Sequence, residues 1–289
     1  MSLDDGYIYP TIVSITSIME NSYNTTYYSF YIMHPENFKQ ENKEKLKNLE
    51  IKYNNRIEIN LINMGQKYNK ARQKKKGMRI ITTPSYYRLS LPDLLPDIDK
   101  IIYLDGDTLT FKDLNELYNI DMTNYYYKGL LDNFPRCVHH ITKKNDHCIC
   151  AGVMLINLKE LRKDNMTQIF DKFIKENKYK LIQHDQTVIN AICYKKIGIL
   201  PAKYGLFNYR NLRSVYRNYR RSKYKYKYSR NELKNAYYHP IISHVTYKPW
   251  KKKGKKMRVV WWNYVIKSGY YKEVCQLYRR GHPKGYCKF

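Results

Sequence analysis

The stretch "KIIYLDGDTLTF", residues 100–111, places two aspartates directly behind an apolar run that is typical of a buried strand. Asp105 and Asp107 flank a single glycine, Gly106. Because alternate residues of an extended chain face the same side, both carboxylates can converge on one point. Two carboxylates about 5 Å apart repel each other by about 3 kcal/mol at an effective dielectric constant of about 20. A divalent cation removes that repulsion, so the pattern predicts a metal site at the end of this strand.

An isolated D-x-D pair can also belong to a solvated turn that binds no metal. Phosphatases of the haloacid-dehalogenase type use the nucleophile motif D-x-D-x-T, but position 109 is a leucine and Thr108 comes one residue too early. Nucleotide-sugar transferases, in which a D-x-D pair holds a metal on the donor diphosphate, fit these residues better. In that case Gly106 would allow a ligand to approach the backbone closely, because glycine has no side chain.

The residues around this stretch alternate between predicted strands and predicted helices. β-Branched and aromatic residues predict strands, and apolar residues at helical spacing predict helices. Strands are predicted within 27–35, 56–64, 100–104, 128–132 and 196–201, helices within 7–22, 36–50, 84–98 and 185–194, and a strand that runs into a helix within 150–165. We expect the helix within 7–22 to be amphipathic. This order predicts an α/β fold with a mostly parallel central sheet, and such sheets bind ligands at the carboxyl ends of their strands.

The length and charge of the chain narrow the functional classes. Its 289 residues are enough for one large α/β domain. The net charge of +28 predicts attraction to polyanions: nucleic acid, anionic lipid or phosphate-bearing substrates. We expect neither a membrane span nor a signal peptide, because long apolar runs are missing and the start "MSLDDGYIYP" has no basic n-region.

The C-terminal part of the sequence differs in character from the rest. In residues 209–230, aromatic and cationic residues alternate, and we see no apolar face that could form a core; the tail, residues 259–289, mixes Trp and Tyr with Lys and Arg. We therefore expect a catalytic domain at 1–208 and a basic, aromatic C-terminal extension at 209–289. Trp250, Trp261 and Trp262 would lie at the headgroup level of an anionic membrane.

The six cysteines do not form a recognisable framework. Without a secretory context, the sequence predicts a reduced chain without disulfides. The stretch "CVHHITKKNDHCIC", residues 137–150, lacks the paired C-x-x-C spacing of a zinc site, so free thiols are expected there.

Several motifs occur in one order along the chain: "LDDGY" at 3–7, the block 85–122 around the D-x-D pair, "AGVMLINL" at 151–158, "HDQTVINA" at 184–191 and "ISHVTYKPW" at 242–250. Together they resemble glycosyltransferase family 8, whose retaining enzymes include bacterial lipopolysaccharide galactosyl- and glucosyltransferases and glycogenin. The resemblance covers most of the chain, about residues 4–265.

The resemblance implies a single Rossmann-like domain of the GT-A type and a hexosyl transfer from a UDP-sugar to a glycan or lipid-linked acceptor. Asp105, Asp107 and His244 would be the metal ligands. An imidazole beside two carboxylates suits Mn²⁺, with Mg²⁺ as the alternative. An enzyme of this kind would be cytoplasmic and peripheral on the inner face of an anionic membrane.

The resemblance also assigns residues to the nucleotide part of the donor. Asp4 and Tyr7 would hold the uridine through a hydrogen bond and ring stacking. Lys248 would pair with the diphosphate, and Arg88 would reach the phosphate or the sugar. Gly106 belongs to the same donor-binding set.

A second group of residues would surround the transferred sugar. The resemblance implies that Asp132 and Asp185 bind sugar hydroxyls, while Ala151 and Gly152 line the pocket. Gln186 would lie beneath the anomeric carbon. Because an amide is a poor nucleophile, we favour front-face substitution with Gln186 as a stabiliser, and Asp185 stays open as an alternative.

The chain departs from the family pattern at several positions. Gly6 and Cys150 stand where asparagine is usual, the segment "HVTYKPW" is short and lacks a glycine, and the first strand is expected to be reduced or missing. A catalytically inactive family member that acts as a scaffold is therefore one alternative. An RNA-binding protein is another, because interleaved aromatic and cationic residues suit single strands. We do not expect nucleic acid as a partner, since it leaves the aspartate pair and His244 unexplained.

Overall fold

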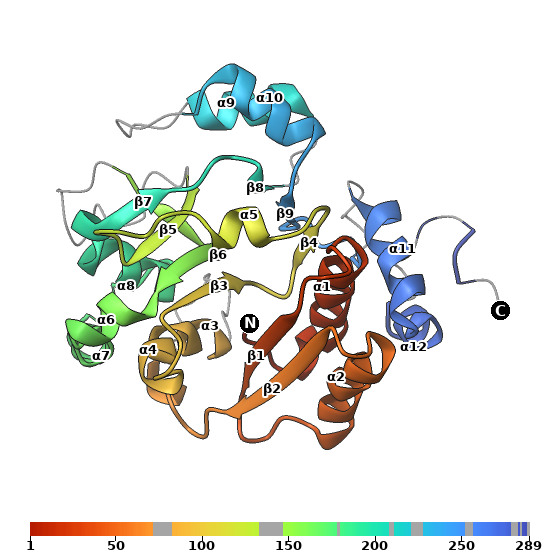
Figure 1. Cartoon of the computed structure of the whole chain (residues 1–289), viewed down its shortest axis with the longest axis horizontal. Helices are drawn as coiled ribbons and strands as arrows, with labels where there is room; N and C mark the ends of the chain where they lie inside the picture. Colours follow the sequence, from red (N-terminus) through yellow and green to blue (C-terminus); the bar gives the residue numbers. More distant parts are fainter. Residues whose placement is uncertain are drawn as a thin grey trace.

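The computed structural model describes residues 1–71, 83–132, 147–177, 180–207, 211–220, 228–251, 257–278, 283 and 285–287. These residues form three small sheets with helices packed around them (Figure 1). The α/β class is therefore confirmed.

The N-terminal sheet is parallel. Strand β1 (Tyr28–His34) and strand β2 (Ile57–Asn63) pair along their whole length and are connected by helix α2 (Gln40–Lys52). Helix α1 (Ile8–Glu20) precedes them and is buried on almost every side, because it packs against both β4 and α11. The expected helix is present, but it is a core helix and not an amphipathic one.

Residues 1–3 lie beside β1 in the place of an inner strand. Leu3 N donates to Met33 O at 3.1 Å, and Met33 N donates to Met1 O at 3.0 Å. Ser2 forms a parallel bridge with Met33. This short extended segment leads directly into the "LDDGY" motif and fixes its position against the sheet.

The central sheet has the strand order β3-β6-β5-β7. Its strands are β3 (Lys100–Leu104), β6 (Ile149–Asn157), β5 (Tyr127–Leu131) and β7 (Ile197–Ile199). Strand β6 runs antiparallel to both β3 and β5, whereas β5 and β7 are parallel. The expectation of a mostly parallel sheet is thus wrong in detail. Apolar periodicity is the same for both strand directions, so it could not reveal the reversal of β6.

The third sheet brings a distant part of the chain to the D-x-D turn. It contains β4 (Thr108–Thr110), β9 (Ile242–His244) and β8 (Tyr204–Phe207). Strand β9 pairs antiparallel with β4, and Thr108 lies opposite His244 in this register. The strand that follows the aspartates therefore pairs with the strand that carries the histidine, and this pairing places His244 beside them.

Short helices cover the central sheet. The proline-interrupted helix expected within 84–98 is confirmed as α3 (Pro84–Tyr87), η3 (Arg88–Ser90) and α4 (Leu91–Leu94). The others are α5 (Asn115–Tyr118), α6 (Leu158–Lys163), α7 (Met166–Glu176) and α8 (Asp185–Ile192), with the 3₁₀ segments η1 (Asp5–Tyr7), η2 (Asn69–Ala71) and η4 (Tyr194–Lys196). Helix α6 packs on β3, and α8 packs on β6.

The C-terminal region contributes to the core, and this includes described residues of the stretch 209–230, for which we expected no apolar face. Helices α9 (Leu212–Arg220) and α10 (Arg230–Tyr238) lie together at the top of Figure 1. Val215 and Leu233 from these helices pack against Leu131 and Leu206. Helix α11 (Arg258–Ser268) packs on α1, and α12 (Tyr271–Leu277) packs on α11.

The three tryptophans are core residues. Trp250, Trp261 and Trp262 are 5%, 1% and 0% exposed and belong to the cluster around α1. The expectation that they lie at a membrane surface is wrong, because each ring is buried within this cluster. In the part of the chain that the structure describes, every helix is too short or too polar to span a bilayer.

The cysteines correct another expectation. Cys275 of α12 and Cys287 are joined by a disulfide, with their Cα atoms 5.5 Å apart. The chain folds back after α12, which the spacing of the two residues in the sequence could not show. Cys148 and Cys150 are free thiols, as expected, but they are buried and Cys150 belongs to β6, whereas the sequence predicted a loop for the stretch 137–150. Most of this stretch lies outside the described residues.

Candidate metal centre

The turn between β3 and β4 holds the two aspartates in place. Asp105 N donates to Gly152 O of β6 at 2.8 Å, and Thr108 Oγ1 donates to Asp105 O at 3.0 Å. Ser14 of α1 is hydrogen-bonded to Thr108 at 2.9 Å. These contacts tie the turn to the central sheet on one side and to the buried helix on the other.

Gly106 has a structural role in this turn. A Cβ atom at Gly106 would collide with the Thr11 side chain of α1. The residue is buried, so the absence of a side chain lets the turn pack against the helix. This accounts for the glycine without the close approach of a ligand that the sequence led us to expect.

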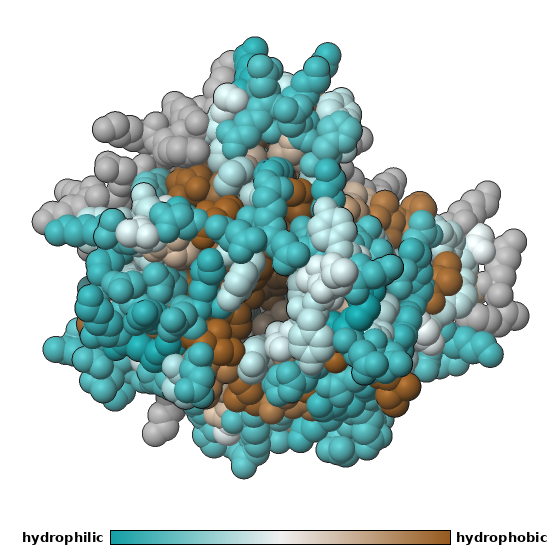
Figure 2. Space-filling view, in the orientation of Figure 1, coloured by the Kyte–Doolittle hydropathy of each residue, from teal (hydrophilic) through white to brown (hydrophobic). Residues whose placement is uncertain are grey.

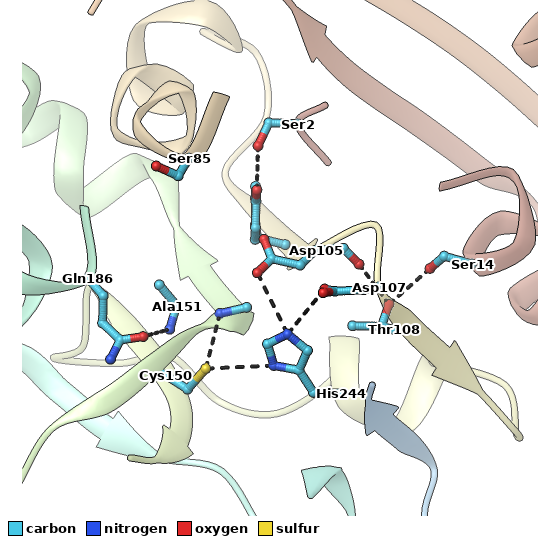
Figure 3. Close-up of polar contacts among 12 residues, drawn as sticks. Ser2, Ser14, Ser85, Asp105, Asp107, Thr108, Cys150, Ala151, Gln186 and His244 are labelled. Carbon is cyan, nitrogen blue, oxygen red and sulfur yellow. Dashed lines mark hydrogen bonds and ion pairs between the residues drawn. The ribbon is translucent and has the colours of Figure 1, made fainter. Parts of the chain in front are cut away.

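Asp105, Asp107 and His244 converge on one point (Figure 3). His244 Nε2 lies 3.2 Å from Asp107 Oδ1 and 3.8 Å from Asp105 Oδ2. One oxygen or nitrogen atom from each residue lies within 4.8 Å of the others. Donors that bind one cation at about 2.1–2.6 Å can be at most about 5 Å apart, so this group fits a single divalent cation.

The electrostatics of the three groups are coupled. Burial opposes charge on Asp107, but the hydrogen bond with His244 and the charges of His244 and Lys248 hold the pKa of Asp107 below its ordinary value. Burial likewise opposes the imidazolium, yet the contacts with Asp107 and Cys150 raise the pKa of His244 above its ordinary value. The contact between Asp107 and His244 thus favours the charged form of each group, against the effect of burial.

Because Gly152 has no side chain, the Asp105 and His244 side chains can occupy the space next to it. A Cβ atom at Gly152 would lie 2.8 Å from Asp105 Oδ2 and equally close to His244 Nδ1. Any larger residue would therefore displace two of the three ligands. The glycine of the "AGV" sequence on β6 thus provides the space in which these two side chains lie.

Arg88 connects the aspartate pair to a second acidic residue. Its guanidinium lies 2.9 Å from Asp105 Oδ1 and 3.1 Å from Asp185 Oδ2, and it also donates to Ala151 O. The Tyr103 ring covers it at 4.2 Å. Arg88 is buried, and in this structure its donors engage protein groups. Burial raises the pKa of Asp185 to about 6, although the charge of Arg88 opposes this.

Gln186 lies between the backbone of β6 and an acidic side chain. Its Oε1 accepts from Ala151 N at 3.0 Å, and its Nε2 donates to Asp132 Oδ2 at 2.5 Å. Gln183 Nε2 donates to the same oxygen at 3.1 Å. Sequence reasoning did not find Gln183; its place directly before the "HDQ" motif was the available signal.

The other residues that we expected to bind the donor are Lys248, Tyr7 and Asp4. Lys248 Nζ donates to Tyr7 OH, and its nitrogen lies 4.5 Å from the centre of that ring. The short "HVTYKPW" segment therefore still brings this lysine close enough to Asp107 to lower its pKa. Asp4 lines a cavity of about 540 Å³ together with Pro35, Gly65, Gln66, Thr83, Tyr87 and neighbouring residues.

The face of the molecule that Figure 2 shows is mainly hydrophilic. Figure 2 shows a hollow near the middle of this face with hydrophobic residues in it and a hydrophilic rim. Such a combination is usual for a ligand-binding site.

Residues 1–254 of the sequence match the model of a protein family described as Glycosyl transferase family 8. A protein of Haemophilus influenzae whose name describes it as a glycosyltransferase is 33% identical over 69% of this chain and 60% of its own length. The lipopolysaccharide 1,2-glucosyltransferase of Escherichia coli is 28% identical over 70% of this chain and 60% of its own length. This chain thus spans less than two thirds of these two curated relatives.

A solved structure supports the same fold. The galactosyltransferase LgtC, in complex with donor and acceptor sugar analogues, superposes with a TM-score of 0.72 over 93% of this chain and 94% of its own. At 17% identity, this similarity concerns the fold alone, and it shows a GT-A arrangement. On the sequence match, which covers most of its residues, the chain belongs to glycosyl transferase family 8.

Proposed function

We propose that this chain is a metal-dependent, retaining glycosyltransferase that moves a hexose from a UDP-sugar to a glycan or lipopolysaccharide-type acceptor. The observation that carries the proposal is the convergence of Asp105, Asp107 and His244 beside Lys248. Family membership and this donor set agree with each other, since two carboxylates and an imidazole suit Mn²⁺ or Mg²⁺.

Asp105, Asp107 and His244 would hold the cation. When bound, a divalent cation stabilises the negative charge that develops on a departing diphosphate. Asp105 can serve the cation with Oδ2 because Oδ1 is engaged by Arg88. Arg88 thus keeps the carboxylate in one orientation, as a positioning residue.

Lys248 and Tyr7 would bind the leaving nucleotide. Lys248 is a half-buried residue whose charge acts on Asp107, so it would stabilise a phosphate bound at the metal centre more strongly than a lysine at the open surface. The cavity lined by Asp4 would accept the uracil, with the Asp4 carboxylate as acceptor for the uracil N–H. Tyr7 is not among the residues that line this cavity; its ring would offer a stacking surface beside Lys248.

The groups around the sugar support front-face substitution. Gln186 is held by Ala151 N and Asp132, so its amide has a defined orientation, but an amide remains a poor nucleophile. Asp185, the alternative nucleophile, forms a buried ion pair with Arg88 and would have to leave it in order to attack. We therefore assign Gln186 to stabilising the sugar cation, and Asp132 and Asp185 to positioning.

We also propose how the chain reaches its acceptor. Residues 209–289 include His244, which completes the metal centre, and Lys248, so they and residues 1–208 would work as one catalytic unit. The net charge of +28 favours an anionic surface, and we propose a cytoplasmic enzyme at the inner face of the membrane with a lipid-linked glycan as acceptor.

The test is sugar release from UDP-glucose, UDP-galactose and their N-acetyl forms in the presence of Mn²⁺. We expect turnover with at least one donor and a loss of about a hundredfold or more in Asp107→Asn, because metal ions contribute several kcal/mol to charge stabilisation. Asp99→Asn, at an exposed ion pair before the same strand, is the matched control and should retain activity.

Turnover that is equal in Asp107→Asn and wild type would reject the metal-dependent mechanism. Tight RNA binding that persists in EDTA, without any binding of UDP-sugars, would favour the nucleic-acid alternative. Metal and UDP binding without turnover on any donor would favour an inactive scaffold.

A further inference from the structure

The two ring nitrogens of His244 face different partners. Nε2 points at the aspartates, whereas Nδ1 lies 3.8 Å from the sulfur of Cys150 (Figure 3). A histidine that binds a metal through one nitrogen almost always donates a hydrogen bond from the other, which fixes the tautomer and the ring orientation. Carboxylates, backbone carbonyls and water are the usual acceptors in that position. At His244 the group in that position is a thiol.

The surroundings of Cys150 orient its sulfur as an acceptor. Gly152 N lies 3.5 Å from Cys150 Sγ and donates to it. Cys150 is on β6 and 8% exposed, so water has little access to the contact. Cys150 pairs with Leu130 of β5, and the Asn190 side chain bonds both the N–H and the carbonyl group of the neighbouring Ile149, so the backbone cannot easily move the sulfur away from the imidazole.

The position of Cys150 separates it from the metal ligands. The donor atoms that lie within 4.8 Å of one another belong to Asp105, Asp107 and His244. Cys150 lies against the opposite edge of the same imidazole. The Phe207 ring also packs against the imidazole, with the ring centres 5.4 Å apart. The imidazole is thus enclosed, with Nε2 directed at the aspartates.

We propose that Cys150 is a positioning residue for the metal centre: its sulfur accepts the Nδ1–H hydrogen bond of His244 and so directs the Nε2 lone pair at the cation. This inference rests on the proposed function, since it requires that the three ligands bind a metal. Removal of the sulfur would leave the Nδ1–H buried without this acceptor and the ring less constrained.

A direct Mn²⁺ titration of the full chain, with free Mn²⁺ measured by electron paramagnetic resonance, tests the proposal without any turnover. We expect Cys150→Ala to weaken Mn²⁺ binding about 10- to 100-fold, the usual effect of losing such an acceptor. Cys150→Ser should retain most of the affinity, because a hydroxyl oxygen can also accept the bond.

Matched controls separate this role from a loss of packing. Cys148→Ala and Cys193→Ala each remove a buried free thiol elsewhere and should bind Mn²⁺ like wild type. Thermal unfolding of every variant shows whether it is folded. Absorption spectra of the Co²⁺-loaded wild type should lack a sulfur-to-metal charge-transfer band, since Cys150 is not a ligand.

The outcomes are distinguishable. Equal Mn²⁺ affinity in wild type and folded Cys150→Ala, or equal losses in Cys150→Ala and Cys150→Ser, would overturn the positioning role and leave the proposed function intact. A charge-transfer band with Co²⁺ that disappears in Cys150→Ser would also overturn it, because the sulfur would then be a ligand. A wild-type chain that binds no Mn²⁺ would contradict the proposed function and this inference together.

Discussion

At the scale of single residues, the carboxylate oxygens of the aspartate pair that face the site are divided between two partners, Arg88 and His244. Asp105 Oδ1 is engaged by Arg88, Asp105 Oδ2 faces His244, and Asp107 Oδ1 faces His244 more closely. Like charges that share a site are tolerable when counter-charges lie close to them. The same division leaves one oxygen of Asp105 available for a cation.

His184, which precedes Asp185 in the sequence, should make the free energy of unfolding depend on pH. Burial lowers the pKa of His184 below its ordinary value of 6.5. Below this value the unfolded chain binds more protons at His184 than the folded protein, so acidification from about pH 7.5 to about pH 5 reduces the free energy of unfolding. In His184→Asn this part of the pH dependence disappears, because the amide side chain does not titrate.

Urea denaturation of both proteins across this pH range measures the effect. The free energy of unfolding of wild type minus that of His184→Asn should decrease as the pH falls. A difference that is constant with pH would show that His184 titrates alike in the folded and unfolded chain.

At the scale of elements, the buried helix α1 organises the site. It packs against β4, whose first residue is bonded to Ser14, and against α11 on another side. Strand β9 pairs with β4 and thereby carries His244 to the aspartates. The packing of α11 on α1 therefore helps to hold α1 in place, and α1 in turn supports the strands that carry the metal centre.

The packing of α11 can be tested at its centre. Trp262 is 0% exposed, so we expect Trp262→Ala to reduce the free energy of unfolding by about 3–5 kcal/mol. Val259 lies on the same helix and is 54% exposed, and Val259→Ala should change stability by at most about 0.5 kcal/mol. Urea denaturation measures both changes. Unchanged stability in Trp262→Ala together with weaker binding to anionic vesicles would instead support a membrane-facing tryptophan.

At the scale of the whole molecule, the candidate site is assembled from distant segments. Tyr7 follows the N-terminal extended segment, the aspartates follow β3, and His244 ends β9. The three segments belong to different sheets. A cation held by the aspartates and His244 would connect two of these segments and so stabilise the folded chain.

This connection predicts a metal-dependent stability. At a free Mn²⁺ concentration about 100 times the dissociation constant, the free energy of unfolding should rise by about 2.7 kcal/mol. The gain should be reversed by EDTA and absent in Asp107→Asn, while Asp99→Asn should show the full response. Thermal unfolding with and without Mn²⁺ measures it; an equal gain in Asp107→Asn would mean that the cation binds elsewhere.

Much of this protein could be predicted from local sequence. The apolar run before Asp105, the strands within 27–35 and 56–64, and the interrupted helix within 84–98 were all predicted, because these signals depend on neighbours along the chain. The motif order identified the family, and with it the meeting of His244 with the aspartates. The roles of the individual site residues remain predictions.

Other features depend on contacts that no local pattern contains. The reversal of β6, the disulfide between Cys275 and Cys287 and the burial of Trp261 all result from segments that meet only in the folded chain. The glycine between the aspartates is required by Thr11 of a distant helix, and the sulfur of Cys150 meets a histidine that lies on another sheet. Local sequence thus determined the elements and the chemistry available, whereas packing decided which side chains share a site, because burial and hydrogen bonding act between neighbours in space.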